Sequence, residues 1–169
     1  SAGFSAEWVK QEIITCGDNG STKINVLDPF AGSGTTLIAA GSVQVNAVGF
    51  EPHPFIYRVA KAKLGWDIDI KLIKDLSIKL IEKASAKTSK TNRLEVPLLG
   101  KCFTDQSLSK LDALRNVYLS EFDTGQPENE VLWLCITSII RSCSMAGTAQ
   151  WQYVLPSKRK LKVLEPFKA

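Results

Sequence analysis

Residues 24–36 read Ile-Asn-Val-Leu-Asp-Pro-Phe-Ala-Gly-Ser-Gly-Thr-Thr, and this stretch decides which fold the chain adopts. A β-branched, apolar run ends at Asp28, and a proline followed by Gly32 and Gly34 then breaks it. Glycine lets the backbone turn sharply and approach a ligand without a clash from Cβ. The pattern therefore predicts a strand, a tight loop and a helix that begins at Thr35.

A second strand and helix follow the loop. Val45–Phe50 is another strand-like run, and it ends at Glu51. Pro54 suits the first position of a further helix, which we expect to end at Gly65, because its fixed φ is helical and this position needs no N–H. Strand, glycine loop, helix, strand, acid and helix in this order predict a parallel βαβ unit with a right-handed crossover.

The rest of the chain is predicted to be mostly helical. Apolar residues recur at helical spacing in residues 68–86, 108–122 and 128–140, and a short strand is expected at 150–155. Two clear strands are too few to bury both faces of an open sheet. We therefore expect an α/β protein with a partial parallel sheet and a helix-rich C-terminal extension.

The length of 169 residues suits one domain with a helical appendage. We expect a ligand-binding βαβ portion at residues 1–84, a polar linker at 85–100 and a helical extension at 101–169. The sequence does not begin with methionine, so we expect either a removed tag or a piece of a longer protein.

Composition excludes several classes of protein. With 44% hydrophobic residues spread along the chain, general disorder is excluded. No apolar run approaches the roughly 20 residues of a membrane helix, and no signal peptide is visible. The four cysteines form no CxxC pair and lie far in sequence from the single histidine, His53, so neither a zinc site nor His-based hydrolysis is expected. Scattered thiols of this kind predict buried, reduced cysteines in a cytoplasmic protein.

Positive charge is concentrated in part of the chain. Between Arg58 and Arg93 basic residues far outnumber acidic ones, and a second basic cluster lies at 158–162. Such stripes suit a polyanionic partner such as nucleic acid. The alternative is an ordinary solvated helix face.

Three nucleotide-binding interpretations compete for the glycine loop. A P-loop needs a lysine before its Ser or Thr, and Ser33-Gly34-Thr35 has none. A dinucleotide fingerprint needs a third glycine, but that position holds Leu37. The third interpretation is S-adenosylmethionine, because its amino-acid end needs a tight glycine loop and its ribose hydroxyls need an acid such as Glu51 at the end of the next strand.

Three segments resemble one family. The nine residues Asp28–Thr36 resemble the cofactor motif of the S-adenosylmethionine-dependent methyltransferases that modify adenine N6 or cytosine N4 in DNA. Gly49–Pro54, leading to Ala60–Lys63, is similar to their second motif, and Phe4–Val9 resembles the segment that precedes their glycine loop. The resemblance covers roughly residues 4–65. It implies a Rossmann-like methyltransferase fold, DNA as partner, and DNA methylation of the restriction–modification kind.

The resemblance also implies which residues hold S-adenosylmethionine. Phe4 would flank the cofactor, Glu51 would accept the ribose hydroxyls, and Pro52 and His53 would lie near the adenine ring. The methionine part would be held by the loop, namely Asp28, Pro29, Phe30, Ala31, Gly32, Ser33, Gly34, Thr35 and Thr36. No metal is implied.

One signature of the family is missing. These enzymes position the target amine with an Asp/Asn/Ser-Pro-Pro-aromatic motif, and no Pro-Pro pair occurs in this chain. We therefore assign no catalytic residue here and expect the motif downstream of Ala169, so that the chain alone is the inactive, cofactor-binding part of a DNA methyltransferase. The alternatives are an RNA base amino-methyltransferase and a non-catalytic, methyltransferase-like module that binds nucleic acid.

Overall fold

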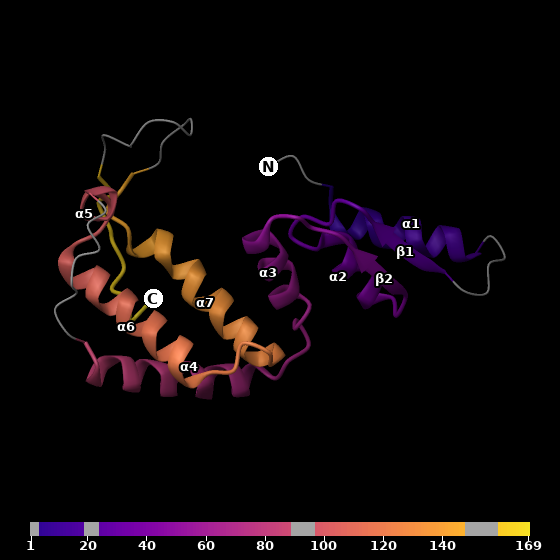
Figure 1. Ribbon diagram of the computed structural model, residues 1–169. Helices are drawn as coiled ribbons and strands as arrows, with labels where there is room; N and C mark the ends of the chain where they lie inside the picture. The colour runs from indigo at the N-terminus through magenta and orange to yellow at the C-terminus, as the bar shows by residue number, and fades with distance from the viewer. Residues whose placement is uncertain (1–3, 19–23, 89–96, 148–158) are drawn as a thin grey trace. The chain divides into compact units, whose positions relative to one another are not determined.

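The computed structural model describes residues 4–18, 24–88, 97–147 and 159–169. The chain forms two compact units, which divide between Ile68 and Asp69. Figure 1 shows the first unit in indigo to magenta and the second in magenta to yellow.

The first unit is built around a pair of parallel strands. Its elements are α1 (Ala6–Asp18), β1 (Asn25–Asp28), α2 (Thr35–Ser42), β2 (Asn46–Gly49) and α3 (Pro54–Lys63). The two strands pair in register from Asn25 opposite Asn46 to Asp28 opposite Gly49. The predicted parallel βαβ unit is therefore confirmed, with a strand order of β1-β2 in the described part of the chain.

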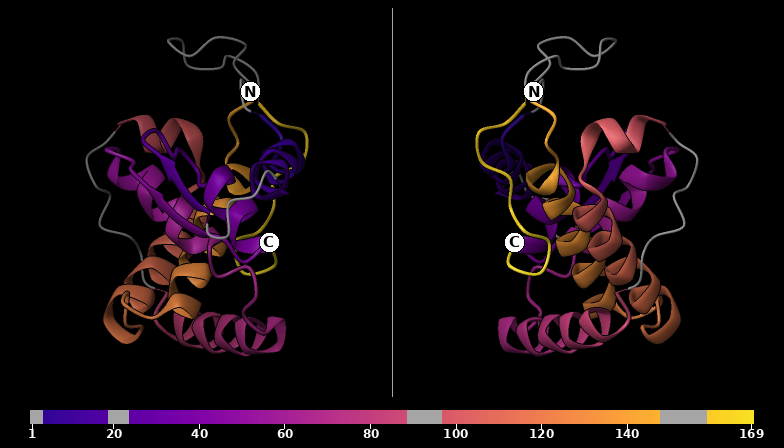
Figure 2. Two further views of the ribbon diagram at one scale, coloured as in Figure 1. Left: turned by 90° about the vertical axis from the view of Figure 1, so that its right-hand side faces the viewer. Right: turned by 90° about the vertical axis from the view of Figure 1, so that its left-hand side faces the viewer.

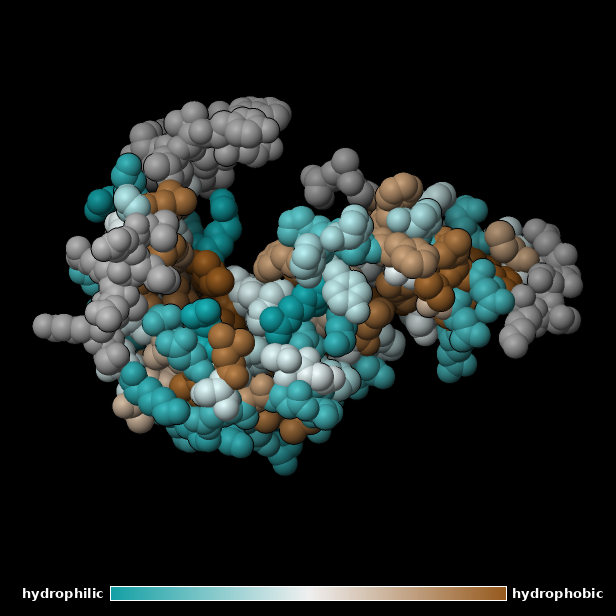
Figure 3. All heavy atoms as spheres, in the orientation of Figure 1, coloured by the Kyte–Doolittle hydropathy of each residue, from teal (hydrophilic) through white to brown (hydrophobic). Residues whose placement is uncertain are grey.

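One face of this small sheet is covered and the other is not. Val9 and Ile13 of α1 pack with Ala39 and Ala40 of α2, and inward-facing residues of both strands lie against this cluster. On the opposite face, Leu27 and Val48 are 65% and 57% exposed. Figure 3 shows hydrophobic residues on the surface of this unit. Part of the expected fold class is thus observed, namely a helix-rich structure with a small parallel sheet.

The second unit consists of packed helices, as predicted. They are α4 (Ile70–Ala86), α5 (Pro97–Cys102), α6 (Asp105–Glu121) and α7 (Pro127–Cys143). Leu80 and Ala84 of α4 form one core with Leu114 and Tyr118 of α6 and Leu132 of α7. The views in Figure 2 show α6 and α7 side by side, with α4 crossing them at one end.

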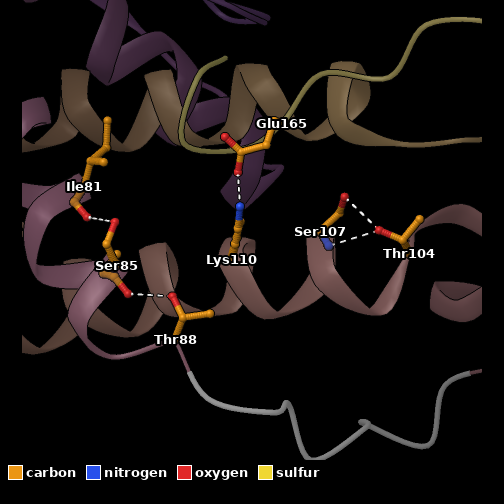
Figure 4. Close-up of polar contacts among 8 residues, drawn as sticks. Ile81, Ser85, Thr88, Thr104, Ser107, Lys110 and Glu165 are labelled. Atoms are coloured by element: carbon orange, nitrogen blue, oxygen red, sulfur yellow. Dashed lines mark hydrogen bonds and ion pairs between the residues drawn. The ribbon is translucent and has the colours of Figure 1, made fainter.

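The C-terminal segment returns to the helices of this second unit. Phe167 packs against its core, and Lys110 of α6 forms an ion pair with Glu165 at 2.5 Å. Figure 4 shows this pair beside the start of α6, where the Thr104 side chain accepts a hydrogen bond from the Ser107 N–H. These contacts make residues 159–169 part of the second unit.

The boundaries of some elements differ from expectation. β2 (Asn46–Gly49) is shorter than the predicted 45–50. The structure groups α4 with the C-terminal helices, whereas we expected residues up to 84 to belong with the βαβ portion. The reason is that Leu80 and Ala84 bury their side chains in the core of the second unit. The expected strand at 150–155 and residues 89–96 of the expected linker at 85–100 lie outside the described residues. On either side, the expected linker overlaps the end of α4 and the start of α5.

The cysteines are free, but they are not all buried as expected. Cys143 is fully buried, which raises the pKa of its thiol, whereas Cys16 and Cys135 are exposed. Across the described ranges, no three potential metal-ligating side chains cluster together. No helix among these residues has the length and apolar character that crossing a membrane requires.

Candidate functional site

The glycine loop and the acid after β2 emerge at the same edge of the sheet. The Phe50 N–H donates to the Asp28 carbonyl, and the Ala31 N–H donates to the Phe50 carbonyl, each at 2.9 Å. The Asp28 carboxylate accepts a hydrogen bond from the Phe30 N–H at 3.0 Å, which begins the turn. These bonds hold the entrance of the loop beside the strand end that carries Glu51.

Two glycines give the loop its shape. Gly32 has φ +52° and Gly34 has φ +84°, in the left-handed region that residues with a Cβ adopt only at a cost. Gly34 also precedes α2 as its N-cap, without a side-chain capping bond. The first N–H groups of an α-helix have no partner within the helix, so the start of α2 presents backbone donors and the positive end of the helix dipole.

The third helix of this unit packs directly on the loop. A Cβ built on Gly34 would lie 3.2 Å from the Ala60 Cβ, closer than ordinary contact. One turn further along α3, the Lys63 ammonium donates to the Ser33 carbonyl at 2.8 Å. Sequence reasoning did not assign Ala60 or Lys63 to the site. Their spacing of three residues, which places both on one helix face, was the available signal.

Glu51 and His53 occupy the turn between β2 and α3. One carboxylate oxygen of Glu51 accepts a hydrogen bond from the His53 N–H at 2.8 Å, and a carboxylate retains acceptor sites after such a bond. The Nδ1 atom of His53 caps α3 by accepting from the Ile56 N–H at 3.4 Å. His53 therefore has a local structural role at the start of α3, and Pro52 beside it is exposed.

Phe4 lies with α1 rather than in the loop. Its ring contacts that of Trp8 with centroids 6.0 Å apart and planes tilted by 60°. Both rings are more than half exposed. Within the loop, Phe30 is 85% exposed, Ser33 is also exposed, and Ala31 and Thr36 are buried. The structure thus brings together the residues from Asp28 to Thr36 with Phe50 and Glu51.

This donor set fits a ligand that carries both a carboxylate and a diol. The open start of α2 offers backbone N–H groups to an anion. A Cβ on Gly32 would lie 3.9 Å from the Phe30 carbonyl oxygen, at an ordinary van der Waals distance, so what requires glycine there is the positive φ rather than lack of space. The Glu51 carboxylate can accept hydrogen bonds from vicinal hydroxyls.

Comparison with known proteins points to one family. Residues 11–62 match a family model described as DNA methylase, of the N6/N4 type. Over 40 residues the chain is 52% identical to the type II methyltransferase M.HindIII of Haemophilus influenzae. This matched segment makes up 24% of this chain and 13% of that protein. The chain is also 34% identical over 58 residues to the type II methyltransferase M.MjaII of Methanocaldococcus jannaschii. This second segment makes up 34% of this chain and 11% of that protein.

No solved structure matches the chain significantly. The matches cover a small part of each curated relative, and the family segment contains β1, the glycine loop, β2 and Glu51. Residues 11–62 are thus similar to the DNA methylases of the N6/N4 family.

Proposed function

We propose that this chain is the S-adenosylmethionine-binding part of a DNA methyltransferase that acts on an exocyclic base amine, adenine N6 or cytosine N4. The observation that carries the proposal is the shared edge of β1 and β2, where the glycine loop and Glu51 are held beside each other. This arrangement lies within the segment that matches the family. In this proposal, the small sheet is part of a Rossmann-like methyltransferase fold.

Different residues of the site would bind different parts of the cofactor. The N–H groups at the start of α2 and the loop from Asp28 to Thr36 would hold the methionine end. Glu51 would accept the ribose hydroxyls, Pro52 and His53 would lie near adenine, and Phe4 would flank the cofactor. When bound, S-adenosylmethionine supplies an electrophilic methyl group.

The role proposed for this chain is to bind and orient rather than to activate the substrate. In this proposal the Asp28 carboxylate, which accepts from the Phe30 N–H at the start of the glycine loop, contacts the loop and the cofactor rather than the target amine. With no Pro-Pro-aromatic motif in the sequence, the acceptor and the aromatic platform for the base would be supplied outside these residues. We propose DNA as the partner, reached through exposed basic residues, and the cytoplasm as the location.

The proposal is tested by isothermal titration calorimetry of the chain with S-adenosylhomocysteine and, separately, with NAD. We expect binding of S-adenosylhomocysteine, because its carboxylate and ribose match the donor and acceptor set of the site. Binding of NAD without binding of S-adenosylhomocysteine would overturn the proposal.

A further inference from the structure

Both ends of one peptide unit in the glycine loop are held in place. The Ser33 carbonyl accepts a hydrogen bond from the Lys63 ammonium at 2.8 Å, and the Gly34 N–H donates to the Ala31 carbonyl at 2.8 Å. Because a peptide group is planar, these two bonds together set the orientation of the whole Ser33–Gly34 unit. The Ser33 hydroxyl lies 3.4 Å from the same ammonium.

The bond from Lys63 is stronger than an ordinary loop contact. Its donor is a full positive charge, and charge-assisted hydrogen bonds are about twice as strong as neutral ones. The close approach of Gly34 to Ala60 on the same face of α3 keeps the base of the Lys63 side chain near the loop. Lys61 of the same helix is exposed and therefore offers a matched comparison.

The held peptide unit directs the donors that follow it. Gly34 adopts φ +84° and leads directly into Thr35, the first residue of α2. A rotation of the Ser33–Gly34 unit would redirect the N–H groups at the start of α2. These are the groups that, in the proposed function, hold the carboxylate-bearing end of the cofactor.

We propose that Lys63 is a positioning residue for binding of the cofactor's amino-acid end, acting through the Ser33 carbonyl. The inference rests on the proposed function, because it concerns the same site. The inference predicts different effects of Lys63 on the two parts of the ligand, the amino-acid end and the adenosine part. Binding of the adenosine part, assigned to Glu51 in the turn after β2, does not depend on Lys63.

The test compares Lys63→Met, Lys63→Arg and the control Lys61→Met by calorimetry with two ligands. S-adenosylhomocysteine carries the amino-acid end, and methylthioadenosine lacks it. We expect Lys63→Met to lower the affinity for S-adenosylhomocysteine about tenfold, the scale of one charge-assisted hydrogen bond. The affinity for methylthioadenosine should fall less than about twofold. Lys63→Arg should restore much of the lost affinity, and Lys61→Met should bind both ligands like the wild-type chain.

An independent measurement needs no ligand. In amide NMR spectra of the free chain, Lys63→Met should shift the Gly34 and Thr35 resonances, while Lys61→Met leaves them in place. Equal weakening of both ligands, or no weakening of either, would overturn the inference. Failure of the wild-type chain to bind S-adenosylhomocysteine would instead overturn the proposed function, and the NMR comparison would still decide whether Lys63 holds the loop.

Discussion

The Asp28 carbonyl accepts a hydrogen bond from the Phe50 N–H at 2.9 Å, at the carboxyl ends of β1 and β2. Parallel strands end at the same edge of their sheet, so this bond aligns the start of the glycine loop with the residue before Glu51. Two acidic residues distant in sequence thereby border one site. In open α/β sheets, ligands bind at this edge.

Substitution of Gly34 tests the geometry of the loop. Gly34→Ala should lower the free energy of unfolding by about 1–2 kcal/mol, because alanine is strained at a left-handed φ and its Cβ would press on Ala60. The matched control is Gly41→Ala in α2, where an added Cβ meets no atom within 4 Å. That variant should be more stable by about 0.4–1 kcal/mol. Urea unfolding measures both, and equal effects of the two substitutions would contradict the described loop.

Substitution of Glu51 tests the ribose contact. Glu51→Ala should weaken binding of S-adenosylhomocysteine by about 1–3 kcal/mol, the scale of hydrogen bonds to a charged group. The control is Glu12→Ala, which removes an exposed acid from α1 of the same unit. Calorimetry with both variants separates a local contact from a general effect of charge. An equal loss of affinity for S-adenosylhomocysteine in the two variants would argue against a ribose site at Glu51.

Among the described residues of the basic stripe between Arg58 and Arg93, some lysines pair with an acid and others are exposed. Lys83 and Lys87 both pair with Glu121, the latter at 2.8 Å, whereas Lys71 and Lys74 on the same helix are exposed. If the stripe contacts phosphates, each contact contributes about −0.9 to the log–log salt slope of binding. The double variant Lys71→Gln/Lys74→Gln should therefore flatten the slope more than Lys83→Gln/Lys87→Gln. Fluorescence anisotropy at several salt concentrations measures it, and identical slopes would leave the stripe as a solvated face.

The cluster around Glu121 makes stability depend on pH. Hydrogen bonds from the Lys83 and Lys87 side chains lower the pKa of Glu121 from 4.5 to about 2. A carboxylate whose pKa is lowered in the folded state contributes its full stabilisation at pH values above its ordinary pKa. That stabilisation is lost as pH falls through the folded-state pKa of about 2. The stability difference between the wild-type chain and Glu121→Gln should therefore shrink between pH 4.5 and 2. Urea unfolding at several pH values measures this difference, and a constant value would refute the pairing.

The chain should have no methyltransferase activity by itself. An exocyclic base amine is a poor nucleophile because its lone pair is delocalised into the ring, so it needs an acceptor and an aromatic platform. The sequence contains no Pro-Pro-aromatic motif that could supply them. Transfer of a tritiated methyl group to mixed-sequence DNA measures the activity. Sustained turnover would show that the acceptor lies within these residues.

The order of local elements could be predicted from the sequence alone. β-branched residues before Asp28, the two glycines of the loop and Pro54 at the start of α3 act on neighbouring φ and ψ angles, so their effect does not depend on distant contacts. β1, the glycine loop, β2 and the starts of α2 and α3 therefore appear within one residue of where the pattern predicts them, whereas α6 begins three residues before the predicted 108. The family resemblance rests on the same short segment, and the match at residues 11–62 supports it.

Tertiary structure decided which of these side chains meet. The sequence placed Lys63 near the second family motif but gave neither Lys63 nor Glu121 a partner. In the structure α3 brings Lys63 to Ser33, and α6 brings Glu121 to Lys83 and Lys87. Helix packing likewise assigns α4 to the second unit and leaves Cys16 and Cys135 exposed. Periodicity identifies an apolar face but not its partner, because that depends on contacts between residues far apart in the chain.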